Sequence, residues 1–143
     1  MIAVDTNVLV YAHRKDSAWH AAAESRVRSL AEGREAWAIP WPCVHEFYAI
    51  VTHARIYRPA SRSEQAIDQI EAWLESPSVV LLAEGDSYWL ALKPLLEAGR
   101  VAGAGVRDAR IAGLCAIHGV RELWTADRDF SRFPELRTHN PLV

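Results

Sequence analysis

The chain has 143 residues, of which 50% are hydrophobic and 24% charged, and its formal net charge is −2. This length suits one globular domain, and the charge excludes a general polycation that would coat nucleic acid or lipid. With no basic leader and no long apolar segment, we expect a soluble cytoplasmic protein without membrane contact. Cys43 and Cys115 lie among apolar neighbours, as expected for buried thiols in a reducing compartment.

Short apolar runs alternate with helical patterns along the whole chain. The run Ile2–Val4 predicts a strand, and the apolar pattern after it predicts a helix from Thr6. In chain order, the later predicted elements are helix Trp19–Leu30, strand Ala36–Ile39, helix Val44–Thr52, a helix from Ser61 or Ser63 to Leu74, strand Val79–Leu82, helix Asp86–Ala98, helix Val106–His118 and strand Leu123–Thr125. This alternation predicts one α/β domain with a short parallel sheet covered on both faces.

Two helix details follow from residue type. Glu64 is placed like the acid of a capping box at the beginning of the helix that ends at Leu74. Pro94 lies inside the helix that ends at Ala98, where its missing N–H predicts a break or a kink.

Acidic residues are expected to converge at one edge of the sheet. Asp5 directly follows the first predicted strand, and Asp127 stands two residues after the last one, at the edge where open α/β sheets bind ligands. Glu46 and Asp108 share the apolar faces of their helices, whereas solvated acids usually occupy the opposite face. Each acid also has a plain interpretation: Asp5 as a helix N-cap, Asp108 as a helix-start acid, Glu46 as a boundary residue, and Asp127 and Asp129 as turn residues. Together they predict a carboxylate cluster.

A cluster of carboxylates needs its charge cancelled. A hard divalent cation, Mg²⁺ or Mn²⁺, takes oxygen ligands, and it can activate a water and stabilise the oxyanions of a phosphate under attack. His45 and Glu46 look like the beginning of a zinc-protease helix, but position 49 is Ala where a second histidine is needed. The pattern therefore favours a hard metal over zinc.

Four parts of the sequence carry a family resemblance. They are Val4-Asp5-Thr6-Asn7-Val8-Leu9, the internal Glu46, Arg107-Asp108-Ala109-Arg110-Ile111-Ala112 and Thr125-Ala126-Asp127-Arg128-Asp129-Phe130. From Ile2 to about Leu142, the chain resembles the PIN-domain family and, within it, the VapC toxins of bacterial toxin–antitoxin modules. The Thr-x-Asp-x-Asp-Phe ending is the most specific part of the match.

The resemblance implies a three-layer α/β/α fold and a Mg²⁺-dependent endoribonuclease, with Mn²⁺ as a plausible substitute. It implies a toxin that cleaves single-stranded or looped RNA, is held inactive by a cognate antitoxin and forms a homodimer. By this resemblance, Asp5 and Asp108 are direct metal ligands, and Glu46 and Asp127 complete the catalytic cluster.

Other residues are assigned supporting roles by the same resemblance. Thr6 and Asn7 match positions whose polar side chains steady the first Asp, and Asp129 shares or replaces the role of Asp127. Four arginines flank the acids, where they either contact RNA phosphates or pair with local acids: Arg107, Arg110, Arg128 and Arg132.

The six tryptophans divide into core and surface candidates. Trp124 lies within a predicted strand and is expected in the core. Trp19, Trp41 and Trp73 lie near the ends of predicted elements, where exposed aromatic side chains would serve an interface.

Three alternatives to a ribonuclease are considered. A haloacid-dehalogenase-like phosphatase needs a second Asp two residues after the first, and Asn7 stands there. A receiver domain needs a late Lys after a strand, but the last lysine is Lys93. A catalytically silent PIN-like module that binds RNA or protein is the third, and the presence of all four acids argues against it.

Overall fold

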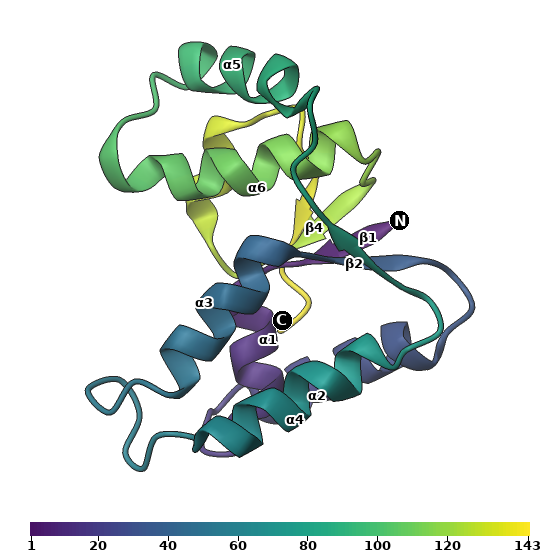
Figure 1. Cartoon of the computed structure of the whole chain (residues 1–143), viewed down its shortest axis with the longest axis vertical. Helices are drawn as coiled ribbons and strands as arrows, with labels where there is room; N and C mark the ends of the chain where they lie inside the picture. The colour runs from purple at the N-terminus through teal and green to yellow at the C-terminus, as the bar shows by residue number, and fades with distance from the viewer.

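A computed structural model describes all 143 residues and contains a five-stranded parallel sheet (Figure 1). The strands are β1 (Ile2–Val4), β2 (Trp37–Pro40), β3 (Val79–Leu82), β4 (Glu122–Trp124) and β5 (Thr138–His139). Their order is β3-β2-β1-β4-β5, and every neighbouring pair is parallel. The direction in which strands are added therefore reverses between β1 and β4, and such a switch point is where open α/β sheets bind ligands.

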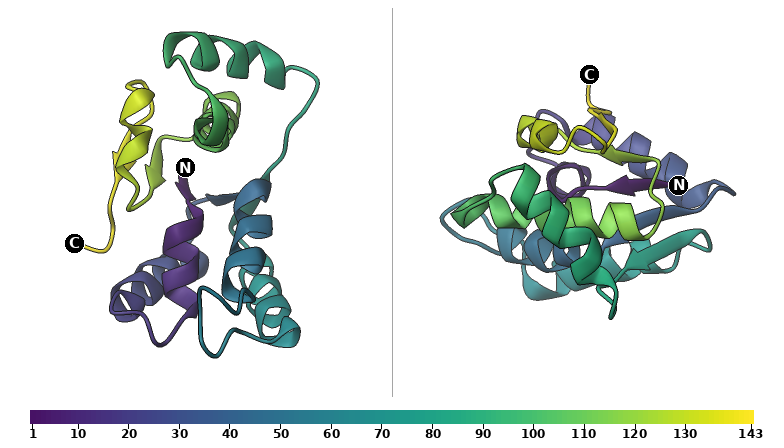
Figure 2. Two further views of the ribbon diagram at one scale, coloured as in Figure 1. Left: turned by 90° about the vertical axis from the view of Figure 1, so that its left-hand side faces the viewer. Right: turned by 90° about the horizontal axis from the view of Figure 1, so that it is seen from above.

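Six α-helices flank the sheet in a three-layer arrangement, as predicted. They are α1 (Thr6–His13), α2 (His20–Glu32), α3 (Trp41–Val51), α4 (Ser63–Leu74), α5 (Tyr88–Ala98) and α6 (Val106–Ile117), with 3-10 turns η1 (Gly103–Gly105) and η2 (Arg128–Arg132). Figures 1 and 2 show α5 and α6 packed together on one side of the sheet and α1 to α4 grouped on the other. None of the helices is both long enough and apolar enough to span a membrane.

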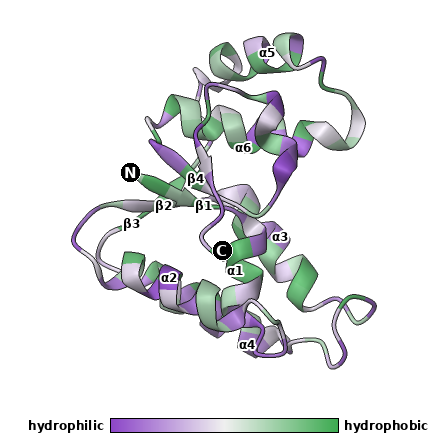
Figure 3. Ribbon diagram, turned by 180° about the vertical axis from the view of Figure 1, so that it is seen from behind, coloured by the Kyte–Doolittle hydropathy of each residue, from purple (hydrophilic) through white to green (hydrophobic).

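The core forms where the apolar strands meet the inner faces of the helices. Trp37, Phe47, Leu9 and Leu123 are fully buried there. Figure 3 shows β1 and α1 as mostly hydrophobic, whereas α2 carries hydrophilic stretches. Most residues of α1 are buried by neighbouring elements, which fixes the positions of both ends of this helix.

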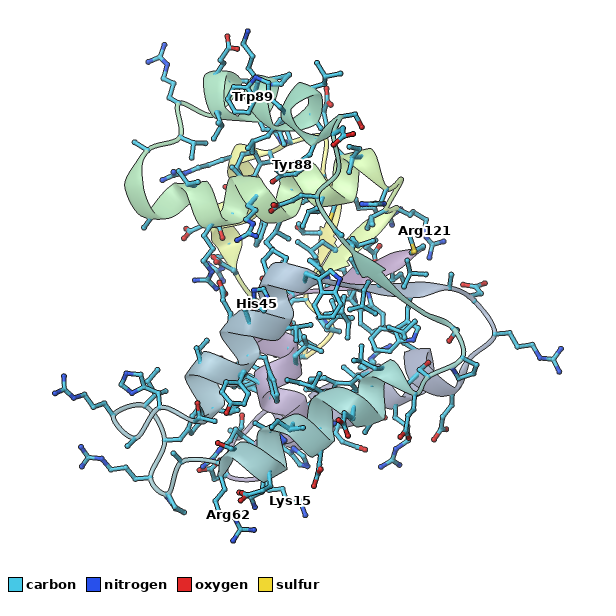
Figure 4. All side chains as sticks on the ribbon, viewed as in Figure 1. Lys15, His45, Arg62, Tyr88, Trp89 and Arg121 are labelled. Carbon is cyan, nitrogen blue, oxygen red and sulfur yellow. The ribbon has the colours of Figure 1, made fainter.

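The approach of α5 to α6 depends on a glycine. Tyr88 packs over Gly113, where an added Cβ would come within 3.1 Å of the tyrosine ring, and the Tyr88 hydroxyl donates to the carbonyl oxygen of Arg110 at 3.0 Å. Figure 4 shows Tyr88 between the two helices. This contact fixes the position of α6, whose first turn contains the acidic residue Asp108.

The predicted elements are present, with ends that shift by a few residues. The helix predicted from Val44 begins at Trp41. Pro42 fits in its first turn, because the N–H groups of a first turn have no partner within the helix. Strand β5 and the two 3-10 turns were not predicted. They are too short to leave a periodic pattern in the sequence.

Three predictions about individual residues are wrong. Arg62, not a serine, is the N-cap of α4, and its N–H is accepted by Gln65 rather than Glu64. Helix α5 continues through Pro94, so the predicted break is absent, and the alternative of a kink stays a prediction; the carbonyl that loses its partner belongs to Leu90, an exposed residue. Trp73 is 7% exposed and packs against Phe47, because the last turn of α4 faces α3.

The other tryptophan predictions agree with the structure. Trp124 is buried, whereas Trp19 and Trp41 are 45% and 39% exposed. Their place in an interface stays a prediction.

Candidate active site at the edge of the sheet

Asp5 is both the cap of α1 and the centre of a buried polar site. Its N–H donates to the carbonyl of Trp124 at 3.0 Å, which extends the pairing of β1 with β4 by one residue. Its Oδ1 accepts from the N–H of Thr6 at 2.8 Å, and the residue is only 3% exposed. Burial raises the pKa of the Asp5 carboxyl, although hydrogen bonds from Thr125 and Thr6 oppose the rise.

Thr125 connects the two strand ends. Its hydroxyl donates to Oδ2 of Asp5 at 2.8 Å and accepts from the side-chain amide of Asn7 at 3.2 Å and from the N–H of Asp127 at 3.0 Å. Asn7 in turn accepts from the N–H of Ala126 at 3.2 Å. Thr125 was given no role from the sequence, and the available signal was its place as the first residue of the Thr-x-Asp-x-Asp-Phe motif.

Three carboxylates converge beside this network. Asp108, Asp127 and Asp129 each place an oxygen within 4.8 Å of the other two, and we call them the acidic trio. Asp108 comes from the first turn of α6, while Asp127 caps η2 by accepting from the N–H of Asp129 at 2.8 Å. None of the three forms an ion pair with a basic residue.

The charges of the trio affect one another. Burial, followed by the negative charge of Asp127, raises the pKa of Asp108 to about 6. The charges of Asp5 and Asp129 act in the same direction, and Arg107 opposes them. The trio is therefore a region of net negative charge without an ion-pair partner, next to the buried Asp5.

Glu46 approaches the site from α3 but has its own partners. It accepts from the hydroxyl of Thr6 at 3.2 Å and forms an ion pair with Arg107. Burial raises the pKa of Glu46, and the charge of Arg107 opposes this effect. The predicted four acids are thus brought into one region, but Asp5 and Glu46 lie outside the trio, and Asp129 lies within it.

The four flanking arginines divide into two pairs. Arg107 pairs with Glu46, and Arg110 pairs with Glu84. Arg128 and Arg132 are exposed and form no ion pair, and their contact with RNA phosphates stays a prediction.

The residues present fit a hard divalent cation. All donors in the trio are carboxylate oxygens, which suits Mg²⁺ or Mn²⁺ better than zinc. Two contacts of Asp5 are long, at 3.5 Å from the Asn7 amide and 3.6 Å from the Cys43 thiol, so each of its oxygens has one strong hydrogen bond and a second position held weakly.

The chain is similar to proteins of one family over nearly its whole length. The family model for the PIN domain matches residues 2–136. Ribonuclease VapC43 from Mycobacterium tuberculosis is 32% identical over 142 residues, covering 99% of this chain and 96% of VapC43.

Solved structures agree on the fold. VapBC2 from Rickettsia felis, solved with a DNA fragment from its promoter, superposes with a TM-score of 0.66 at 22% identity over 98% of both chains. Mycobacterium tuberculosis VapC20, described as a sarcin–ricin loop cleaving toxin, gives a TM-score of 0.64 at 20% identity, covering 92% of this chain and 93% of VapC20. The family-model match and the identity to VapC43 together show that the chain belongs to the PIN-domain family, in its VapC branch.

Proposed function

We propose that this chain is the toxin of a toxin–antitoxin pair and that it hydrolyses RNA phosphodiester bonds as a metal-dependent endoribonuclease. Curated relatives that span its length are named VapC ribonucleases, and structures with the same fold are VapBC complexes. The observation that carries the proposal is the acidic trio at the switch point of the sheet. A fold keeps such repulsion where a function requires it.

The trio and Asp5 are the residues that would hold the metal, with Mg²⁺ the proposed ion and Mn²⁺ a substitute. Such an ion would activate a water and offset negative charge on the phosphate under attack. Asp108, which belongs to the trio and is coupled to Asp5 by charge, is the ligand common to this arrangement and to the Asp5–Asp108 pair expected from the family.

The neutral residues around Asp5 orient it. Thr125 and the N–H of Thr6 each hold one carboxylate oxygen, and Asn7 ties the beginning of α1 to the end of β4 through Thr125 and Ala126. Because these donors carry no charge, they fix the carboxylate without cancelling its attraction for a cation.

The ion pair of Arg107 with Glu46 places a guanidinium beside the acids. A phosphate that enters the site competes with Glu46 for this guanidinium, and arginine binds phosphate oxygens with two parallel hydrogen bonds. Once released from Arg107, Glu46 is a carboxylate with a raised pKa beside Asp5 and the trio, and it is suited to accept a proton.

Cleavage of total RNA by the purified protein tests this proposal. We expect defined cuts in Mg²⁺ and in Mn²⁺, none in chelator, and none with an Asp5→Asn/Asp108→Asn double variant purified in the same way. Cleavage that persists in chelator, or in the double variant, would show a contaminating nuclease or a different chemistry. RNA binding without any cleavage would favour the silent PIN-like module.

The partner proposals need separate experiments. Expression of the chain alone is expected to slow bacterial growth, and a small co-encoded antitoxin is expected to bind it and relieve the effect. A homodimer is proposed from the family, and exposed apolar side chains such as Trp89 and Leu90 on α5 offer area for it. A molar mass near 16.0 kDa in solution at micromolar concentration would contradict the dimer.

A further inference from the structure

The loop between α3 and α4, residues 52–62, is a concentrated positive region, and we call it the basic loop. It contains three arginines and no acid, although the chain as a whole has a net charge of −2. Arg55 and Arg58 are exposed and form no ion pair, and Arg62 has only a 3.8 Å contact with the exposed Glu64. Free cations gathered in this way attract a polyanion.

The basic loop is held from inside by Arg14. This guanidinium donates to the carbonyl of Pro59 at 3.0 Å and to the hydroxyl of Ser61 at 3.3 Å, and it lies 4.3 Å from the ring centroid of Tyr57. The N–H of Ser61 donates to the carbonyl of Val51 at 2.8 Å. The end of the loop is therefore fixed to α1 and α3 before any ligand binds.

The exposed half of the basic loop is also ordered. The carbonyl of His53 accepts from the N–H groups of Ile56 and Tyr57, and its ring accepts from the N–H of Arg55 at 3.1 Å. A ligand that binds a preformed loop loses less conformational entropy of the protein on binding. The loop is thus a built surface that presents arginines outward.

The basic loop lies on the same side of the molecule as the acids. It directly follows α3, whose Glu46 contacts Thr6 and Arg107 at the candidate active site. Figure 1 shows the α3–α4 connection and the beginning of α6 on the same side, with α3 between them, and the left panel of Figure 2 looks onto that side. From Glu46 to Val51, the last residue of α3, the helix rises about 7.5 Å, and the loop with an extended arginine side chain lengthens this reach to roughly 15–20 Å.

We propose that the basic loop binds the phosphates of the RNA strand whose scissile bond lies at the acidic trio. A span of roughly 15–20 Å corresponds to about five phosphates at 3.4 Å per nucleotide along a helical strand. The substrate is then an RNA whose strand continues for several nucleotides beyond the cut. The choice of RNA as the polyanion rests on the proposed function, whereas the choice of the loop as an anion-binding surface does not.

Binding measured without cleavage tests this inference. The probe is a fluorescein-labelled 20-nucleotide uridine RNA in chelator, with affinity followed by anisotropy between 0.1 and 1 M salt. The Arg55→Gln/Arg58→Gln variant is compared with Arg34→Gln/Arg121→Gln, which removes the same charge from two exposed arginines that form no ion pair. Figure 4 places Arg121 on the opposite side from the basic loop.

Loss of two phosphate contacts on single-stranded RNA is expected to lower the slope of log affinity against log salt by about 1.4, which is roughly 25-fold in affinity at 0.1 M if the proteins are equal at 1 M. Arg55→Lys/Arg58→Lys, which keeps the charge, should retain most of the affinity. Equal affinity of the parent and the glutamine variant, or equal loss in the Arg34/Arg121 control, would overturn the inference. Loss of binding to phosphatidylglycerol vesicles with RNA affinity unchanged would overturn it in favour of a lipid surface.

The two proposals fail in different ways. A protein that binds RNA through Arg55 and Arg58 but cuts none in Mg²⁺ contradicts the proposed function alone. A protein that cuts RNA but binds it equally with and without these arginines contradicts the basic loop alone. Melting temperatures of all variants within a few degrees of the parent establish that the fold is retained.

Discussion

The two ends of α1 carry polar clusters of opposite character. At its C-terminal end, the buried Arg14 pairs with Asp16 at 2.6 Å and also donates to Pro59 and Ser61. At its N-terminal end, Asp5 is held by uncharged donors and lies beside three further carboxylates that no basic residue neutralises. One helix thus joins a cluster whose charges cancel to a cluster whose charges add.

This difference separates stability from function. Where the fold supplies a partner for every buried polar group, the cluster holds loops and helices together. Where it leaves like charges side by side, the cluster costs stability in the absence of a cation and creates affinity for one. An open pocket of about 710 Å³ lies at the C-terminal end of α1 and is lined by His13 and Arg14, so pocket size alone points away from the acidic trio.

The largest expected effect is on RNA cleavage by variants at the N-terminal end of α1, where the carboxylates lie. Asp108→Asn and Asp5→Asn keep the shape of the side chain but remove ligand charge, and metal assistance contributes several kcal/mol to the barrier. Each variant is therefore expected to lose roughly a hundredfold or more in Mg²⁺-dependent cleavage rate. Asp68→Asn, an exposed acid on α4, is the matched control and should keep the parental rate. Full activity of either site variant would remove the metal assignment.

The next effect is a loss of folding stability in a variant at the C-terminal end of α1, where Arg14 pairs with Asp16. Arg14→Ala leaves the carbonyl of Pro59 and the hydroxyl of Ser61 without a charged donor and removes the contact with Tyr57. Hydrogen bonds to charged groups contribute about 1.5–3 kcal/mol, so we expect a loss of roughly 2–3 kcal/mol in the free energy of unfolding. Urea denaturation measures it, with Lys15→Ala as the exposed control that should change by less than about 0.5 kcal/mol. Equal stability of both variants would mean that Arg14 is dispensable.

The third effect is a gain in folding stability when a carboxylate at the N-terminal end of α1 is neutralised. The pKa of Asp108 is about 6 in the folded protein and 3.8 when unperturbed, so the folded state takes up this proton first as pH falls. The stability cost of its charge is fully present above pH 6 and disappears as pH falls through that range. A shift of two units would correspond to about 3 kcal/mol, but the residue is only partly buried and solvent screens its charge, so Asp108→Asn is expected to gain about 1 kcal/mol at pH 7.5 in chelator.

Melting curves with chelator and with Mg²⁺ measure this gain. Mg²⁺ should stabilise the parent more than the variant, because only the folded parent binds it well. If Asp108→Asn is less stable than the parent in chelator, Asp108 is a structural acid of the first turn of α6, and the model of uncompensated charge is wrong.

The sequence predicted the local parts of this arrangement well. An apolar run that ends in Asp5 places the carboxylate at a strand end, and the same logic applies to Asp127. The apolar stripe of α6 correctly oriented Asp108 toward the sheet edge, and the family was recognised from these same segments. Such features depend only on strand and helix period, which neighbouring residues determine.

Contacts between distant segments could not be predicted in this way. The pairing of Glu46 with Arg107 and of Arg14 with Pro59 joins residues more than 40 positions apart. Helical period gives the face on which a side chain lies but not which partner reaches it, and for this reason Trp73 was expected at the surface. Asp129 enters the trio because the N–H of Asp129 donates to Asp127 in η2, a turn too short to be recognised.

The smallest expected effect is on the pH dependence of folding stability, to which the two ends of α1 contribute with opposite sign. Burial lowers the pKa of His13 below its usual 6.5, and the positive charges of Arg14 and His20 act in the same direction, whereas the hydrogen bond with Gln69 opposes them. The unfolded chain therefore takes up this proton first, so stability from neutral His13 is complete above pH 6.5 and is lost as pH falls toward its folded pKa. Acidification thus weakens this end of α1 and relieves repulsion at the other.

His13→Gln should remove the loss of stability that acidification causes at His13. Asp108→Asn should remove the gain in stability that acidification causes at Asp108. In chelator, between pH 7 and 5.5, the free energy of unfolding of His13→Gln is expected to rise relative to the parent by a fraction of a kcal/mol, and that of Asp108→Asn to fall relative to it. Urea denaturation at closely spaced pH values measures both slopes. Glutamine can replace the imidazole hydrogen bonds to Gln69 and Ser61, at 3.2 and 2.9 Å, only in part, so the comparison uses the slopes and not the absolute stabilities. If both variants shift the slope in the same direction, the two ends of α1 do not differ in the way their charges suggest.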